Sequence, residues 1–180
     1  THVAPMLTTT WNQSPYYNAY CPYDTVYSQL TVAGCVATAT AQIMKYWNHP
    51  ATGYGTHAYV CNNGRISYGV LSADFGNTNY QWLAMPNALT SASSQAEVDA
   101  VATLIYHVGV ASNMRYNVSA QGGSGTYNHN DYYPSAMSAL VDHFKYAPDI
   151  VVVAPGSHNA DAYSAMLRAE LDLQHTYHLS

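Results

Sequence analysis

The stretch VAGCVATATAQIMKYW, Val32–Trp47, predicts a buried helix with a cysteine in its first turn. Three small residues, Ala37, Ala39 and Ala41, allow other elements to pack close to it, and large apolar residues follow toward its C-terminal end. Pro50 cannot continue a helix and biases the preceding residue away from helical conformation, so we expect the helix to end by residue 48. A helix of this composition would be the element around which the fold is built.

Cys35 is a candidate nucleophile because of its position on this helix. The first turn of a helix has unpaired backbone N–H groups and carries the positive end of the helix dipole, and both favour a thiolate over a thiol. Gly34 would leave the approach to the sulfur open. A cysteine among alanines is also a common component of a packed core. The spacing alone therefore allows two interpretations, a reactive thiol and a buried structural one.

Composition indicates one globular domain of 180 residues, in which 48% are hydrophobic and 8% charged. The net charge of −5, with 5 Lys and Arg, supplies no basic surface, which argues against binding to nucleic acid or to a membrane surface. No apolar run approaches the roughly 20 residues that span a bilayer. The 18 tyrosines carry hydroxyl groups that need a partner or water, a composition suited to an extracellular protein that contacts peptides.

The chain has three cysteines, so one stays unpaired if a disulfide forms. Cys35 is the candidate for that free thiol. A bridge between Cys21 and Cys61 is then one alternative, and three free thiols are the other.

The whole chain, 1–180, divides into an extended arm over 1–31, the central helix over 32–48 and mixed helices and short strands over 51–180. An Asn-Asn-Gly turn at 62–64 between two β-prone pieces predicts a hairpin of strands 56–61 and 65–68. Apolar periodicity predicts helices over 95–110, 133–146 and 160–173, and short apolar runs predict strands at 150–153 and from 176. These patterns predict an α+β fold.

The segment Gly34–Tyr46, followed by Asn48 and Pro50, resembles the nucleophile segment of the streptopain family of secreted bacterial cysteine peptidases. The resemblance implies a papain-like fold, of which this chain supplies the nucleophile helix and only part of the β-rich half. It also implies a cysteine endopeptidase in which the Cys35 thiolate attacks the scissile carbonyl. The resemblance covers Trp11 to about Leu173, which corresponds to roughly the N-terminal two thirds of a mature member by length.

A second segment, Trp11–Asn18, is similar to an Asn-Gln-x-Pro-Tyr-Asn pattern of the same family, with one extra tyrosine before Asn18. The glutamine of that pattern contributes to the oxyanion hole, and the resemblance assigns this role to Gln13, beside the backbone N–H of Cys35. Gln29 competes for the role, because it lies six residues before Cys35, as the oxyanion glutamine of papain does.

The Gly/Ser-rich segment 119–126 is similar to a family loop that lines the cleft where the substrate backbone binds. Glycines would let a peptide approach closely. The resemblance therefore makes Gly122, Gly123 and Ser124, together with Gly34, candidates for substrate binding. A flexible surface loop is the alternative.

A cysteine peptidase also needs a histidine to take the thiol proton and return it to the leaving amine. The family carries it in a Gly-Gly-His-Ala-Phe segment, which none of the nine histidines reproduces. His107, His129, His175 and His178 are assigned no role. The spacing of His175 and His178 permits metal binding, but no carboxylate or cysteine pattern completes a zinc site around these two. We expect the base on a missing C-terminal segment or on a companion chain, and this chain alone to be inactive or nearly so.

The resemblance further implies protein substrates, no cofactor, secretion, and a precursor with an inhibitory N-terminal pro-domain. A non-catalytic module, which binds a peptide or protein through the tyrosine-rich surface and the Gly/Ser loop, is the alternative function. Capture of an active-site-directed inhibitor by Cys35 separates the two, since a binding module needs no reactive thiol. If Cys35 is instead a buried structural residue, alkylation would occur only after denaturation.

Overall fold

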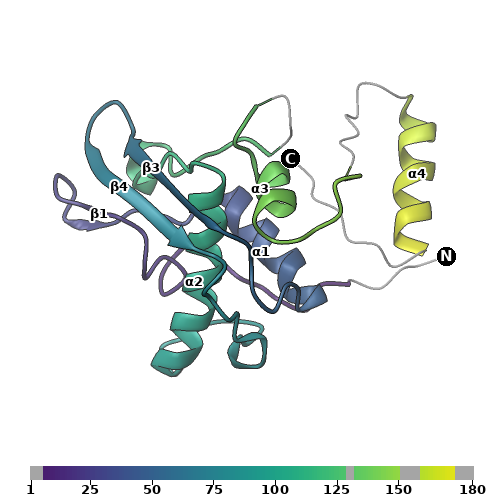
Figure 1. The fold of residues 1–180 in the computed structure, drawn as a ribbon, viewed down its shortest axis with the longest axis horizontal. Coiled ribbons are helices and arrows are strands. Elements are labelled where there is room, and N and C mark those ends of the chain that lie inside the picture. Colours follow the sequence, from purple (N-terminus) through teal and green to yellow (C-terminus); the bar gives the residue numbers. More distant parts are fainter. Residues whose placement is uncertain (1–5, 129–131, 151–158, 173–180) are drawn as a thin grey trace.

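The computed structural model describes residues 6–128, 132–150 and 159–172. Its elements follow one another as β1 Tyr23–Asp24, β2 Gln29–Leu30, α1 Cys35–Trp47, β3 Thr56–Asn62, β4 Ser67–Asp74, α2 Gln95–Ala111, α3 Ala136–Asp142 and α4 Ala160–Asp172, with short 3₁₀ turns at Trp82–Ala84 and Ser119–Gln121. Helices and antiparallel strands are mixed, as the α+β prediction requires (Figure 1).

Helix α1 occupies most of the range predicted for the central helix, but it begins at Cys35 because the backbone of Gly34 is not helical. Gly34 has φ 91°, a conformation that favours glycine. At the other end Asn48 adopts the left-handed conformation with φ 47° and donates its backbone N–H to the carbonyl of Lys45. The first residue of the helix is thus set by a glycine that precedes the cysteine directly.

Helix α2 packs against α1, α3 and the β3–β4 hairpin, and Figure 1 shows it running from the hairpin to the lower edge of the molecule. Ser94 and Glu97 form a reciprocal capping box at its start. The helix is buried on most of its surface, and its long apolar side chains meet the buried side of α1 through Ala37, Ala41 and Met44. The predicted helix over 95–110 is therefore correct to within one residue.

The predicted hairpin is present, with β3 and β4 antiparallel and Tyr59 opposite Leu71. The second strand is longer than the predicted 65–68, because it continues through Gly69 to Asp74 while paired with β3. In the turn, the side-chain oxygen of Asn63 accepts the backbone N–H groups of Arg65 and Ile66. Side chains on one face pack on α2, and the other face is exposed to solvent.

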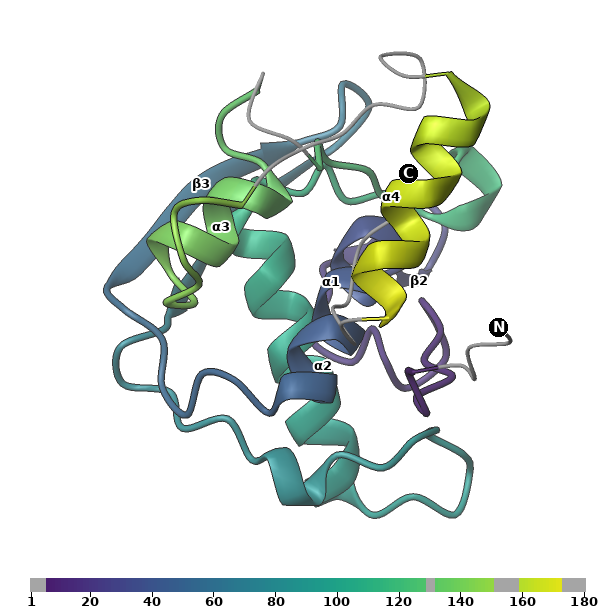
Figure 2. The same ribbon diagram turned by 90° about the vertical axis from the view of Figure 1, so that its right-hand side faces the viewer.

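The N-terminal arm holds to the body of the protein through long-range contacts. Trp11 is buried, and its indole N–H donates to the carbonyl of Pro86 at 2.8 Å. Farther along, the arm forms the small antiparallel ribbon β1–β2, which the sequence does not predict. Figures 1 and 2 show this arm in purple, passing alongside α1.

The C-terminal helices differ in how well their limits are predicted. Helix α3 is shorter than the predicted 133–146, because Ser135 caps its start through a capping box with Ser138 and Lys145 has a left-handed φ of 60° after its end. Helix α4 agrees with the prediction of 160–173, and it stands apart from the other helices in Figure 1. The strands expected at 150–153 and from 176 fall on residues that lie almost wholly outside the described ones. Among the described residues, no helix has the length and apolar character needed to cross a bilayer.

Candidate active site

Cys35 is the first residue of α1, and its thiol is free and exposed. Within the described parts of the chain, its sulfur has no hydrogen-bond partner. A Cβ on the neighbouring Gly34 would lie 2.8 Å from the Cε of Met114, so the glycine also permits close packing directly before the cysteine. The interpretation of Cys35 as a buried core thiol is wrong, and the sulfur lies at the positive end of the helix dipole, open to an incoming molecule.

The other two cysteines are buried and unbridged, so the Cys21–Cys61 disulfide is not formed. Burial raises the pKa of the Cys21 thiol to about 12 and also raises the pKa of Cys61. Cys61 donates its S–H to the carbonyl of Met114 at 3.5 Å. Both behave as small core residues, in contrast with Cys35.

The main chain of Gln13 lies beside the segment that leads into α1. The carbonyl oxygen of Gln13 accepts the backbone N–H of Ala33 at 3.1 Å, and Gln13 is half-buried. The competing Gln29 is exposed and lies in β2, where it is paired with Asp24. The structure thus joins Gln13, but not Gln29, by a hydrogen bond to the residues directly before Cys35.

The Gly/Ser segment borders the same residues from another direction. Val32 donates its backbone N–H to the carbonyl of Asn117 at 3.0 Å, and its own carbonyl accepts the Ser124 hydroxyl at 2.5 Å. Gly122 is exposed and Gly123 is half-buried, with φ of 85° and 75°. Only 7% of Ser124 is exposed, so its hydroxyl anchors the loop, and a contact with a ligand would fall to the glycines.

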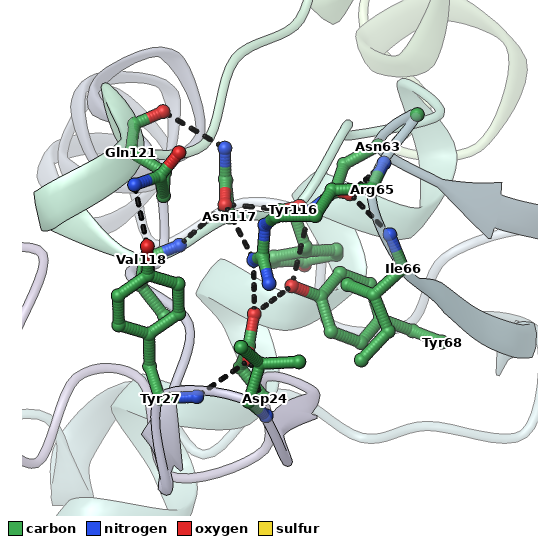
Figure 3. A network of polar contacts seen from close by, with 12 residues as sticks. Asp24, Tyr27, Asn63, Arg65, Ile66, Tyr68, Tyr116, Asn117, Val118 and Gln121 are labelled. Atoms are coloured by element: carbon green, nitrogen blue, oxygen red, sulfur yellow. Dashed lines mark hydrogen bonds and ion pairs between the residues drawn. The ribbon is translucent and has the colours of Figure 1, made fainter.

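A polar network ties this loop to the arm and to the hairpin (Figure 3). At its centre is Asp24, which is 0% exposed and forms an ion pair with Arg65. Its carboxylate also accepts the Tyr68 hydroxyl at 2.8 Å and the backbone N–H groups of Val26 and Tyr27. These donors, Arg65 first, hold the pKa of Asp24 well below its usual range. No local sequence pattern predicts this network; the one signal for it in the sequence is that Asp24 is the only acidic residue before Asp74.

None of the histidines in the described ranges is hydrogen-bonded to Cys35. His107 is buried and its Nδ1 is 3.0 Å from the hydroxyl of Tyr80, and burial lowers its pKa to about 4. His57 is 2.7 Å from the amide oxygen of Asn113, and the remaining two, His49 and His143, lie near backbone carbonyls. Of the other histidines singled out from the sequence, 129, 175 and 178 lie outside the described residues. The described groups of His, Cys, Asp and Glu include none that could hold a metal ion.

Comparison with known proteins gives concordant matches. The family model described as the peptidase C10 family matches residues 11–180. Streptopain of Streptococcus pyogenes serotype M1 is 26% identical over 172 residues, which cover 89% of this chain and 41% of that protein. The thiol protease/hemagglutinin PrtT of Porphyromonas gingivalis is 32% identical over 112 residues, which cover 59% of this chain and 12% of that protein.

Two solved structures are similar over almost the whole chain. The active wild-type interpain A cysteine protease of Prevotella intermedia has a TM-score of 0.84 and 34% identity, covering 96% of this chain and 67% of its own. A fragment of prointerpain A of the same organism, carrying a cysteine-to-alanine mutation, has a TM-score of 0.81 and 34% identity, covering 93% and 51%. The fold is therefore papain-like, and this chain spans less than half the length of the streptopain that it matches.

Proposed function

Because the chain belongs to the peptidase C10 family, we propose that it is the nucleophile-bearing part of a cysteine endopeptidase that hydrolyses peptide bonds in proteins. The observation that carries the proposal is the exposed, free thiol of Cys35 on the first residue of α1. The two other thiols are buried, so Cys35 is the one that a substrate can reach.

In the proposed reaction the Cys35 sulfur attacks the scissile carbonyl carbon, and the carbonyl oxygen takes the negative charge of a tetrahedral intermediate. The backbone N–H of Cys35 and the side-chain amide of Gln13 are the proposed donors to that oxygen. Their closeness is supported by the hydrogen bond from Ala33 to Gln13. Gly34, Gly122 and Gly123 would let the substrate backbone approach the site, with Ser124 as the anchor of the loop.

The histidine that takes the thiol proton and protonates the leaving amine is proposed to lie on a separate or further C-terminal segment. The four histidines in the described ranges support this proposal, because each has a hydrogen-bond partner other than Cys35. Secretion and an inhibitory pro-domain in the precursor are part of the same proposal; the prointerpain relative supports the second.

The proposal is tested by intact mass under denaturing conditions, before and after incubation of the native protein with a peptidyl epoxide directed at papain-like enzymes. We expect one adduct on Cys35, none in Cys35→Ala, and an unchanged adduct in the matched control Cys61→Ala. A companion polypeptide with the histidine segment, detected in the same spectrum, would identify the source of the base. A folded chain that gives no adduct although the histidine-bearing polypeptide is present would contradict the proposal and favour a binding module.

A further inference from the structure

We propose that Asn117 is a positioning residue, which holds the loop of residues 117–125 against the segment entering Cys35, and that the buried Asp24–Arg65 ion pair fixes Asn117 in turn. The inference rests on the proposed function, because it gives that loop a part in peptide binding. Its evidence is a continuous set of hydrogen bonds from a buried carboxylate to the residues beside the nucleophile.

The main chain of Asn117 is bonded both to the loop and to the segment before α1. Its carbonyl oxygen accepts the N–H of Val32 at 3.0 Å, and its N–H donates to the Ser124 hydroxyl at 2.9 Å. The Ser124 hydroxyl in turn donates to the carbonyl of Val32. Val32, Asn117 and Ser124 are therefore all hydrogen-bonded to one another, and Val32 is the third residue before Cys35.

The side chain of Asn117 closes the loop on itself and links it to the hairpin (Figure 3). Its amide N–H donates to the backbone carbonyl of Gln121 at 2.9 Å. Its amide oxygen accepts from the Nη2 of Arg65 at 3.3 Å, from the side-chain amide of Asn63 at 3.3 Å and from the N–H of Val118 at 3.0 Å. Donor and acceptor of this one amide are both used.

Asp24 determines where Arg65 lies. The carboxylate is fully buried, whereas the Arg65 side chain is 29% exposed and would have other rotamers open to it without this partner. The guanidinium is also held over the ring of Tyr27, 4.9 Å from its centroid, and the Tyr27 hydroxyl accepts from the side chain of Gln121 at 2.6 Å. The arm, the hairpin and the loop thus meet at one ion pair.

The loop needs such support because it contains Gly122, Gly123 and Gly125, and glycine loses the most conformational freedom when it is ordered. A loop that must be ordered by the ligand binds it less tightly than one already held in place. Loss of the Asn117 contacts should therefore weaken recognition of a peptide while leaving the exposed sulfur of Cys35 equally open to a small molecule.

The test compares two alkylating agents that share one reactive group, a dipeptidyl chloromethyl ketone and chloroacetone. In each, the thiolate sulfur bonds to the methylene carbon and chloride leaves. Rate constants at Cys35 are measured by mass spectrometry for the wild type, Asn117→Asp and the control Asn87→Asp. Asn117→Asp keeps the shape and the acceptor but loses the donor to the Gln121 carbonyl; Asn87 accepts the Thr8 hydroxyl elsewhere on the surface.

We expect Asn117→Asp to lower the rate with the peptidyl agent about 10-fold and to leave the rate with chloroacetone within about twofold, since misplacement of binding groups affects only the bound reagent. Asn87→Asp should match the wild type with both. Arg65→Lys keeps the charge but not the planar guanidinium, so it should reproduce the effect in part. This variant replaces Asn117→Asp in the test if circular dichroism shows that Asn117→Asp is unfolded.

Two different results would overturn the positioning role, and only one of them would also overturn the proposed function. If the wild type prefers the peptidyl agent but folded Asn117→Asp and Arg65→Lys keep that preference, the positioning role is overturned and the proposed function stands. If the wild type reacts no faster with the peptidyl agent than with chloroacetone, the loop does not recognise peptide and the proposed function fails with it.

Discussion

The backbone N–H of Ala33 donates to the carbonyl oxygen of Gln13 at 3.1 Å, although the two residues are twenty positions apart in the chain. Trp11, two residues before Gln13, donates its N–H to the side-chain oxygen of Gln42 on α1 at 3.2 Å. The arm is thereby fixed at Trp11 to the helix and at Gln13 to the segment that precedes the helix. This arrangement makes the proposed oxyanion role of Gln13 directly testable.

Gln13→Ala should weaken binding of a peptide aldehyde, whose hemithioacetal with Cys35 presents an oxygen where the oxyanion would form. Removal of one oxyanion-hole donor lowers the catalytic rate of other enzymes by about 10²-fold, and we expect aldehyde affinity to fall by a similar factor. Gln29→Ala is the matched control, because Gln29 is exposed in β2, and it should leave aldehyde affinity unchanged. Affinity is measured by competition with a fluorescent alkylating agent. A loss of affinity in Gln29→Ala but not in Gln13→Ala would contradict the prediction and assign the oxyanion role to Gln29.

The three thiols should differ in their reaction with iodoacetamide. In the native protein we expect one adduct, on Cys35, because Cys21 and Cys61 are buried and their thiol pKa values are raised. In denaturant all three should react. Intact mass followed by peptide mapping checks this, and native labelling of Cys61 at the rate of Cys35 would contradict the described core.

His107 should make stability depend on pH. Burial lowers its folded-state pKa from 6.5 to about 4, so the unfolded chain binds the proton at a higher pH than the folded one. The free energy of unfolding therefore falls as pH drops from about 6.5 toward about 4, and between about pH 7.5 and about pH 5 the loss should be on the order of 2 kcal/mol.

Urea unfolding at the two pH values measures this loss for the wild type and for His107→Gln, in which it should be much smaller. His49→Gln is the control, since His49 is a half-buried histidine that packs edge-on against Tyr146. An equal pH dependence in wild type and His107→Gln would show that other groups cause it.

Gly109→Ala should destabilise the protein although alanine is the better helix former. A Cβ at this position of α2 would lie 2.2 Å from the hydroxyl oxygen and 3.1 Å from Cζ of the fully buried Tyr116. Overpacking of this kind costs about 1–3 kcal/mol, more than the gain of about 1 kcal/mol from helix propensity. Thermal unfolding checks it, with Gly125→Ala as the control because nothing lies within 4 Å of a Cβ there; equal stability of Gly109→Ala and wild type would contradict this packing.

The parts of the fold that the sequence predicts well are those specified by neighbouring residues. The capping box of Ser94 and Glu97 sets the start of α2, and the Asn63-Gly64 turn sets the hairpin. The continuation of β4 past Gly69 depends on pairing with β3, and the β1–β2 ribbon depends on Asp24 and its distant partner, so local patterns contain neither.

The same division holds for the candidate site. Cys35 could be found from its surrounding sequence because the helix and the preceding glycine are contiguous with it. The importance of Asn117 arises from contacts with Val32, Arg65 and Ser124, of which two are more than fifty residues away. An asparagine in a polar loop gives no local indication of such contacts.

Ala33 and Val32, the two residues that lead to Gly34 and the cysteine, are each held through their backbone N–H, one by the carbonyl of Gln13 and the other by that of Asn117. Every non-proline residue offers these groups, whatever its side chain. The entry to the nucleophile is thus built from groups that amino-acid replacement leaves in place. Such a frame can survive extensive sequence divergence, and the TM-score of 0.84 to a structure of 34% identity shows that the fold as a whole is retained at that divergence.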